Sequence, residues 1–176
     1  MSNYGDNPFI NQSIEDKLES FVNARFLPLD VEEYLLSRTK HYNKTFYRGL
    51  PFPMHLIKEG LVIENWHGAS HWSVQKDIAL DFAIEERSGY VNEEYRDELI
   101  QEYGEDNVHF VPLLMICRGG NFIPICELIK ADSKFRREQE YCNIGDDFRV
   151  VKIRTEIIYN KNIIIVEVDQ IKRGDK

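Results

Sequence analysis

The chain has 176 residues, of which 43% are hydrophobic and 30% charged, and its formal net charge is −8. This length suits one compact domain, and the composition is too apolar for a disordered chain. A net negative charge repels phosphate backbones, so nucleic acid is disfavoured as the main partner, although Lys134, Arg136 and Arg137 form a local basic patch. No membrane-spanning run and no signal-peptide pattern are found, which predicts a cytoplasmic protein without a membrane partner.

The N-terminal third shows helical spacing. Ser13 is a candidate cap with Asp16 three positions on, and Phe21 lies on the apolar face that follows. After the break at Pro28, a second helix is predicted from Asp30. A strand over 45–50 that ends at Gly49, a short helix over 54–58 and a strand over 61–63 are expected next. Ser73 is then a plausible cap for a helix that carries Ala79, Phe82 and Ala83, and residues 91–103 continue the helical pattern up to Gly104.

From residue 108 the pattern indicates strands. Two apolar runs, 109–117 and 121–128, are separated by Gly119-Gly120, which predicts a hairpin. Further strands are predicted over 148–154, 156–159 and 163–169, with a turn at Asn160-Lys161. Helices in the first half and strands in the second predict the α+β class. Cys117, Cys126 and Cys142 form no C-x-x-C pair and the histidines have no ligand spacing, so we predict buried thiols and no metal site.

Three motifs carry possible chemistry. Phe46-Tyr47-Arg48-Gly49 presents a guanidinium beside a glycine where backbone can approach a phosphate ligand, although for this short motif alone a surface arginine beside a turn glycine is the better explanation. His71-Trp72-Ser73 precedes the helix with Ala79-Leu80-Asp81-Phe82-Ala83, which can frame a pocket or be a cap with a core Phe. In Glu138-Gln139-Glu140, two carboxylates on one face of a strand repel each other, which indicates a function unless the strand is a solvated edge.

Taken in this order, the motifs resemble the mono-ADP-ribosyltransferases of the arginine–serine–glutamate class, over residues 45 to 168. They are most similar to the small Alt/Mod-type transferases of T-even bacteriophages, which carry a like R-G-x-P segment, a like I-A-L-x-F-A helix and a like E-Q-E. The resemblance implies an ADP-ribosyltransferase-like fold, with helices in the N-terminal half packed on a split, mostly antiparallel β core. It also implies a single domain over 1–176, with a helical lead-in at 1–44 and a catalytic core at 45–168.

The resemblance implies roles for individual residues. Glu140 would stabilise the oxocarbenium-like transition state formed when NAD⁺ loses nicotinamide. Arg48 would hold the pyrophosphate, the backbone of Gly49 would hold the carboxamide, and Phe82 would stack on the nicotinamide ring. Ser73 would support Glu140 or the ribose.

Two further roles concern the acceptor and the partner of Glu140. Glu138 would engage the acceptor, with Phe135 as a recognition aromatic, because glutamate at this place goes with arginine acceptors. The family has serine where this chain has His71, whose imidazole can make the same hydrogen bond to Glu140. A one-residue slip would instead give that role to Ser70.

These roles predict transfer of ADP-ribose from NAD⁺, a co-substrate, to an arginine of a bacterial host protein, with no prosthetic group. The alternatives are an NAD⁺ glycohydrolase, in which water is the acceptor, and a degenerate binding module in which His71 is the lesion. The paired carboxylates argue against the module.

Overall fold

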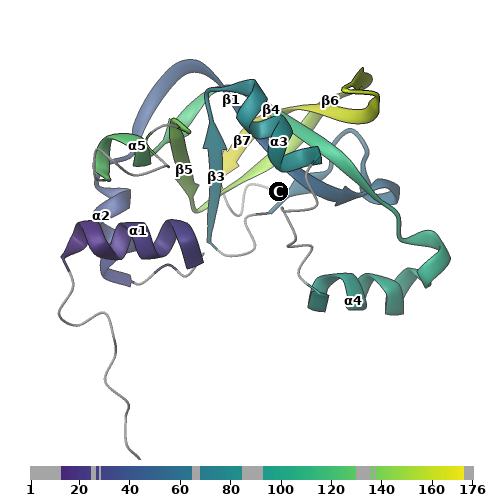
Figure 1. Ribbon diagram of the computed structural model, residues 1–176, viewed down its shortest axis with the longest axis horizontal. Helices are drawn as coiled ribbons and strands as arrows, with labels where there is room; N and C mark the ends of the chain where they lie inside the picture. Colours follow the sequence, from purple (N-terminus) through teal and green to yellow (C-terminus); the bar gives the residue numbers. More distant parts are fainter. Residues whose placement is uncertain are drawn as a thin grey trace, which may run out of the picture.

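The structure is a computed structural model that describes residues 13–24, 27, 29–64, 68–84, 93–129, 136 and 138–172 (Figure 1). Its centre is a seven-stranded sheet in the order β2-β6-β7-β4-β1-β3-β5. The strands are β1 (Lys40–Pro53), β2 (Val62–Ile63), β3 (Ala69–Ser73), β4 (Phe110–Phe122), β5 (Glu140–Ile144), β6 (Asp146–Ile158) and β7 (Lys161–Lys172). Only the β4–β7 neighbours in this sheet are parallel, so the predicted mostly antiparallel core is confirmed.

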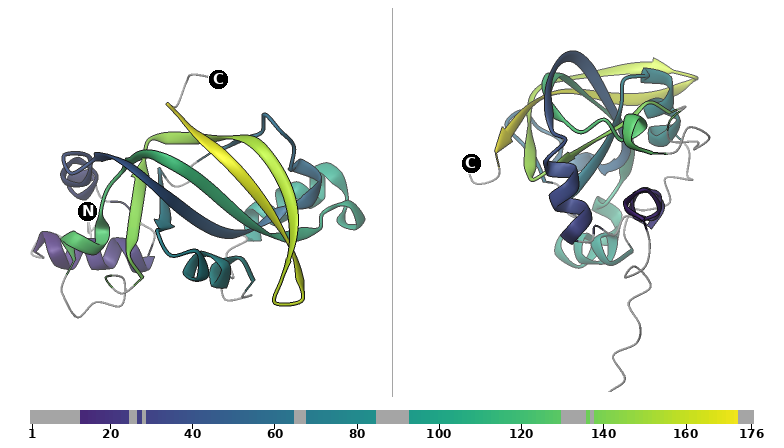
Figure 2. Two further views of the ribbon diagram at one scale, coloured as in Figure 1. Left: turned by 90° about the horizontal axis from the view of Figure 1, so that it is seen from above. Right: turned by 90° about the vertical axis from the view of Figure 1, so that its left-hand side faces the viewer.

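Five α-helices are found among the described residues: α1 (Ile14–Ala24), α2 (Leu29–Leu36), α3 (Lys76–Ile84), α4 (Glu93–Tyr103) and α5 (Ile125–Leu128). Short 3₁₀ turns lie at Met54–Leu56 and Glu105–Asn107. Figures 1 and 2 show α1 and α2 at one end of the molecule, beside β5, and α4 at the opposite end. No helix in these ranges is both long and apolar enough to cross a membrane.

The sheet curls around its main core. Trp72 on β3 and Phe148 on β6 are separated by three strands in the sheet order, yet their ring centroids lie 4.6 Å apart. Phe46 and Phe122 belong to the same apolar cluster and stack with centroids 3.8 Å apart. Because this concave face is filled with side chains, the helices must pack on the other face of the sheet.

Two helical units cover that other face. Leu18 and Phe21 of α1 pack with residues of α2 and with Cys142 and Ile144 of β5 in a second apolar cluster. Ala79 and Leu80 of α3 pack on β4 and β7 in a third cluster. The outer end of β5 and the middle of β1 are therefore each covered by a helix, and the residues between these helices hold the predicted site.

Several predicted elements are confirmed. The first helix begins at Ile14, and the Ser13 hydroxyl accepts a hydrogen bond from the Asp16 amide at 3.2 Å, as a cap does. Strands β6 and β7 form the predicted last hairpin, but its turn residues are Tyr159 and Asn160, with φ of 51° and 59°, one position before the predicted Asn160-Lys161, because Lys161 already belongs to β7. Gly104, with φ of 84°, follows the end of α4 as predicted.

Other predictions are wrong. Gly119-Gly120 does not turn a hairpin: β4 runs through both residues to Phe122, and the chain then forms the short helix α5 instead of a strand. The strand predicted to end at Gly49 runs from Lys40 to Pro53. Residues 146–158 form one strand rather than two. The expectation that helices occupy the N-terminal half is not confirmed, because β1, β2 and β3 lie among the early helices and α5 among the late strands.

The error at Gly49 has a clear physical reason. A Cβ atom at this position would lie 1.7 Å from the Ala79 carbonyl oxygen and 2.7 Å from the Ala83 nitrogen, both in α3. The glycine therefore allows α3 to approach the strand closely, and the strand does not need to end there. Sequence alone does not show which surface a glycine meets.

Candidate active site

The site is built on three neighbouring strands. Tyr47 of β1 pairs with Ser73 of β3, and Ser73 pairs with Glu140 of β5, so the three residues form a row across the sheet. Paired residues on adjacent strands project from the same face, and this face is the one that α1 and α3 cover. Glu140 is the first residue of β5 and is 8% exposed. A buried carboxylate at a strand end, beside a polar neighbour, is the central feature of the site.

His71 holds this carboxylate. Its Nδ1 atom lies 2.5 Å from Oε1 of Glu140, and the two side chains are 28% and 10% exposed. Ser70 is directed to the other face of β3, where it is fully buried and accepts a hydrogen bond from Trp72 Nε1 at 2.8 Å. Of the two residues considered from the sequence, His71 is the one that the structure brings to Glu140.

Ser73 ties the loop before Glu140 to the start of α3. Its hydroxyl donates to the Glu138 carbonyl oxygen at 2.8 Å and accepts from the Gln75 amide at 3.0 Å. The predicted cap role is wrong, because Ser73 ends β3 and α3 begins only at Lys76. The serine instead fixes the backbone that delivers Glu140.

Glu138 lies in a turn rather than on a strand. Gln139 has φ of 47°, a left-handed conformation, and its amide donates to the Arg136 carbonyl oxygen at 3.3 Å. Glu138 and Glu140 therefore do not share one face of a strand, contrary to the prediction, because β5 begins only at Glu140. The backbone of Glu138 still lies close to Ser73, the strand partner of Glu140, because the Ser73 hydroxyl donates to the Glu138 carbonyl oxygen. Phe135, Lys134 and Arg137 lie outside the described residues, and Arg136 is exposed.

The remaining predicted residues lie on β1 and α3. Arg48 pairs with Met115 of the main core, whereas Gly49 pairs with Leu114 beneath α3, so the two project from opposite faces of β1. The Nη1 atom of Arg48 is buried. Phe82 is 47% exposed on α3, although its helical neighbours Ala79 and Ala83 are buried. This exposed aromatic ring is available to a planar ligand.

The cysteines are not nucleophiles of this site. Burial, followed by the charge of Glu140, raises the pKa of Cys142 well above its usual value. Burial, followed by Asp169, raises the pKa of Cys117 to about 12. Both thiols are therefore neutral at physiological pH, and the predicted burial is confirmed for these two, whereas Cys126 is only partly buried. The described residues include no group of three or more His, Cys, Asp or Glu side chains that is arranged to hold a metal ion.

The structure adds two residues near the site that the sequence did not single out. Phe21 of α1 packs on the imidazole of His71, with ring centroids 5.3 Å apart. Lys44 of β1 contacts the ring of Tyr141, the neighbour of Glu140, at 4.2 Å, and donates to its hydroxyl. Phe21 was predicted only as part of an apolar helix face, and its contact with β3 is a long-range one that periodicity does not show.

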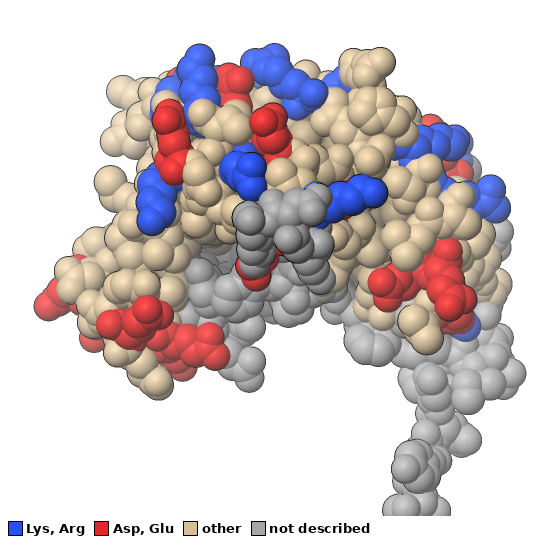
Figure 3. All heavy atoms as spheres, turned by 180° about the vertical axis from the view of Figure 1, so that it is seen from behind, with Lys and Arg blue, Asp and Glu red and all other residues tan. Residues whose placement is uncertain are grey.

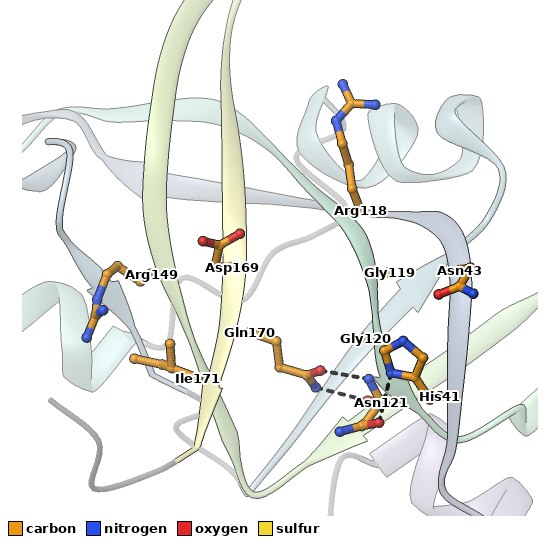
Figure 4. A pocket seen from close by; sticks show the side chains of 10 residues that line it. All are labelled: His41, Asn43, Arg118, Gly119, Gly120, Asn121, Arg149, Asp169, Gln170 and Ile171. Atoms are coloured by element: carbon orange, nitrogen blue, oxygen red, sulfur yellow. Dashed lines mark hydrogen bonds between the residues drawn. The ribbon is translucent and has the colours of Figure 1, made fainter.

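A separate hollow lies at the far end of β4, between the start of β1 and the end of β7 (Figure 4). Gly119 and Gly120 line it, and the Gln170 side chain bridges to the Asn121 amide at 2.7 Å. Figure 4 shows Arg118 and Arg149 pointing in different directions, away from Gln170. This hollow contains none of the predicted site residues, and its charged groups do not converge.

Comparison with known proteins gives fold relatives only. No family model matches the chain, and no curated protein matches it. The solved structures that match include ADP-ribosyltransferase Vis with the M6 inhibitor (TM-score 0.61, 17% identity, 95% of this chain and 76% of that one). They also include Vis with agmatine (TM-score 0.58, 16% identity, 96% and 78%) and the Vis toxin of Vibrio splendidus (TM-score 0.53, 17% identity, 92% and 67%). The chain therefore has an ADP-ribosyltransferase-like fold.

Proposed function

We propose that the protein is an NAD⁺-dependent mono-ADP-ribosyltransferase with Glu140 as its catalytic carboxylate. The observation that carries this proposal is the buried Glu140 at the start of β5, held by His71 on the adjacent strand. It lies on a fold shared with ADP-ribosyltransferase Vis. A carboxylate fixed in a largely buried place is suited to stabilise positive charge that appears in a transition state.

The reaction breaks the bond between nicotinamide and ribose. The bonding electrons leave with nicotinamide, and the ribose carbon gains oxocarbenium character, as in glycoside hydrolysis. Oε1 of Glu140 is held by His71, which gives the carboxylate one orientation. Oε2 would then hydrogen-bond the ribose. The charge of the carboxylate then favours the transition state over the ground state.

Other residues would bind the donor. The guanidinium of Arg48 suits a pyrophosphate, which it can bind bidentately, although its side chain projects from the face of β1 opposite to the row that ends in Glu140. The exposed ring of Phe82 suits nicotinamide stacking, and the backbone of Gly49 lies under α3 close to that ring's helix. Ser73 supports the site indirectly, through the backbone of Glu138.

We propose that the acceptor is an arginine side chain of a protein in the cytoplasm of a bacterial host. Glu138 comes two residues before Glu140, and a carboxylate there can pair with a guanidinium and accept its proton. One Vis structure was solved with agmatine, which also carries a guanidinium group. The resemblance to the Alt/Mod-type enzymes suggests a phage origin for the chain and a host protein as the target.

The first experiment is a nicotinamide-release assay with NAD⁺ and bacterial lysate. Glu140→Gln keeps the shape of the side chain and removes its charge, so we expect a loss of at least about a hundredfold in rate. Glu59→Gln, a substitution in an exposed turn, is the matched control and should retain wild-type activity. Near-normal nicotinamide release by Glu140→Gln would falsify the catalytic assignment.

The acceptor is tested with Glu138→Gln. This variant should stop labelling of lysate proteins while slow NAD⁺ hydrolysis continues, because Glu140 remains. Mass spectrometry of wild-type products should place ADP-ribose on arginine, and neutral hydroxylamine should release it. A label that resists protease and disappears with nuclease, or that lies on Cys, Ser or Asn, would exclude arginine as the acceptor. Nicotinamide release without any labelled product would identify a glycohydrolase.

A further inference from the structure

The imidazole of His71 is held from two directions. Its Nδ1 atom meets Oε1 of Glu140 at 2.5 Å. Its ring face meets Phe21, with centroids 5.3 Å apart and the ring planes inclined by 37°. Phe21 is only 2% exposed, so it is a fixed part of the packed helix α1 and not a mobile surface ring.

The surroundings of Phe21 explain why it is fixed. Val31 and Leu35 of α2 are fully buried in the same cluster. Cys142, which pairs with His71 across the strands, is also fully buried and forms the floor of this cluster. The helix is thus pressed onto β5 by apolar contacts, and Phe21 projects from it toward the one imidazole that touches Glu140.

We infer that Phe21 is a positioning residue for the predicted catalytic pair, and that α1 is therefore part of the active site. The effect of Phe21 on catalysis rests on the proposed function. A histidine side chain has two rotatable bonds and two ring nitrogens, so several orientations compete unless packing selects one. Contact with Phe21 selects the orientation in which Nδ1 meets Glu140, and this in turn fixes the direction of the carboxylate.

A serine at position 71 would not need a positioning residue of this kind. A serine hydroxyl at this position has one rotatable bond before its oxygen and no ring face to support. The larger imidazole has a second rotatable bond and a second ring nitrogen. Contact with the ring of Phe21 limits rotation about that bond and so determines which nitrogen faces Glu140. Phe21 and His71 should therefore be energetically coupled, which a double-mutant cycle measures directly.

The first test compares Phe21→Ala with Leu18→Ala, which removes a neighbouring buried side chain from the same helix. Both are measured as nicotinamide release at a temperature where circular dichroism shows folded protein. Phe21→Ala should lower kcat about tenfold or more, the scale of a misplaced catalytic group, with little change in KM. Leu18→Ala should leave kcat within about threefold of wild type. If Phe21→Ala does not fold, Phe21→Leu keeps most of the apolar volume and removes the ring. Equal losses in the Phe21 and Leu18 variants would overturn the proposal.

The second test is the cycle with His71→Ser. In that background the substitution at Phe21 should change kcat less than about twofold, because the imidazole through which it acts is absent. A loss of kcat that is as large with serine as with histidine would overturn the proposal, since Phe21 would then act by another route.

The third test does not depend on activity. Nitrogen-15 NMR at a pH where the imidazole is neutral should show one tautomer of His71 in the wild type, with the proton on Nδ1. In Phe21→Leu the signals should shift toward an average of both tautomers, and in Leu18→Ala they should not. An unchanged tautomer in Phe21→Leu would overturn the proposal. If the wild type releases no nicotinamide, the proposed function fails, and this measurement alone decides the role of Phe21.

Discussion

Tyr42, Phe46 and Tyr141 form an aromatic enclosure around the ammonium group of Lys44. The Nζ atom lies 4.2 Å from the ring of Tyr141, 4.7 Å from that of Tyr42 and 5.8 Å from that of Phe46. The ammonium donates to the Tyr141 hydroxyl, whereas the buried Tyr42 hydroxyl has no hydrogen-bond partner among the described residues. Tyr141 follows Glu140 on β5, so the two side chains project from opposite faces of the strand. The enclosure therefore packs on the concave face of β5, and the predicted catalytic carboxylate lies on the other face.

The two hydroxyls should respond differently to removal. Tyr42→Phe deletes a buried donor without a partner, so the free energy of unfolding in urea at pH 7 should stay the same or rise by about 1 kcal/mol. Tyr141→Phe deletes the acceptor of a charged donor, so stability should fall by about 1.5 kcal/mol or more. The opposite ranking would show that the Tyr42 hydroxyl has a partner.

The same pair predicts an alkaline loss of stability. Burial, as the main cause, raises the pKa of both Tyr42 and Tyr141 from 10.0 to about 12. Above pH 10 the folded state therefore binds more protons than the unfolded state, so stability is complete below pH 10 and is lost as pH rises towards 12. Urea unfolding between these values should show a smaller decline for Tyr42→Phe than for wild type. Equal declines would remove Tyr42 as a source of the effect.

At the scale of elements, the contact between β1 and α3 sets the geometry of the predicted donor site. Gly49 lies against the backbone of Ala79 and Ala83, and Phe82 of the same helix turn is exposed. The spacing Ala79-x-x-Phe82-Ala83 thus has two roles, because its small residues approach the strand while its aromatic residue faces outward. The position of the Phe82 ring depends on the absence of a side chain at Gly49.

Gly49→Ala tests this dependence. The added methyl group would lie 1.7 Å from the Ala79 carbonyl oxygen, so α3 must move. We expect stability to fall by more than about 2 kcal/mol, as overpacking does, and nicotinamide release to fall even in the folded fraction because Phe82 is displaced. Gly60→Ala is the control: its φ is 82° but the space around it is open, so stability should fall by only about 1 kcal/mol and activity should remain. Normal activity in Gly49→Ala would show that the spacing of α3 from β1 does not matter.

How much of the fold followed from the sequence depends on the range of each interaction. Local signals were sufficient for the cap at Ser13, the stop at Gly104 and the last hairpin. They failed at Gly119-Gly120, where a pair that is typical of a turn lies inside β4. There a Cβ at Gly120 would meet the Gln170 side chain at 2.6 Å, so the glycine serves a contact with a strand 50 residues further on. No local pattern contains that information.

The candidate site shows the same division. The motif order predicted that His71 or Ser70 would meet Glu140, and strand alternation in the structure brings His71 there and buries Ser70 on the other face. The prediction that Glu138 lies on a strand was wrong because Gln139 has a left-handed conformation within a turn, which an E-Q-E sequence does not indicate. The sequence did not predict Phe21 as a site residue, because its contact with His71 joins residues that are 50 positions apart in the chain.

Charge is unevenly distributed over the whole molecule. Figure 3 shows acidic side chains gathered on the two projecting parts that carry α4 and the N-terminal helices, and basic side chains over the sheet between and above them. The acidic residues of α4 and the following turn include Asp97, Glu98, Glu102, Glu105 and Asp106, all of them exposed. On this face the acidic side chains are therefore concentrated at both ends, and a basic protein acceptor would be attracted to either end.

Binding of NAD⁺ is a property of the whole folded molecule, since its proposed contacts come from β1, α3 and β5. A ligand that binds only the folded state stabilises it by about 2.7 kcal/mol at a hundred times its Kd. For a chain of 176 residues, this raises Tm by about 5–10 °C.

Glu140→Gln should keep nearly the full shift, because the charge of the carboxylate acts in the transition state rather than in binding. Arg48→Lys should lose part of it, because a point charge replaces a planar donor pair and tenfold weaker binding removes about 1.4 kcal/mol. Arg154→Lys, on β6 in an ion pair with Glu156, is the control and should shift as the wild type does. A full shift in Arg48→Lys would remove Arg48 from the donor site, and no shift in the wild type would mean that this fold does not bind NAD⁺.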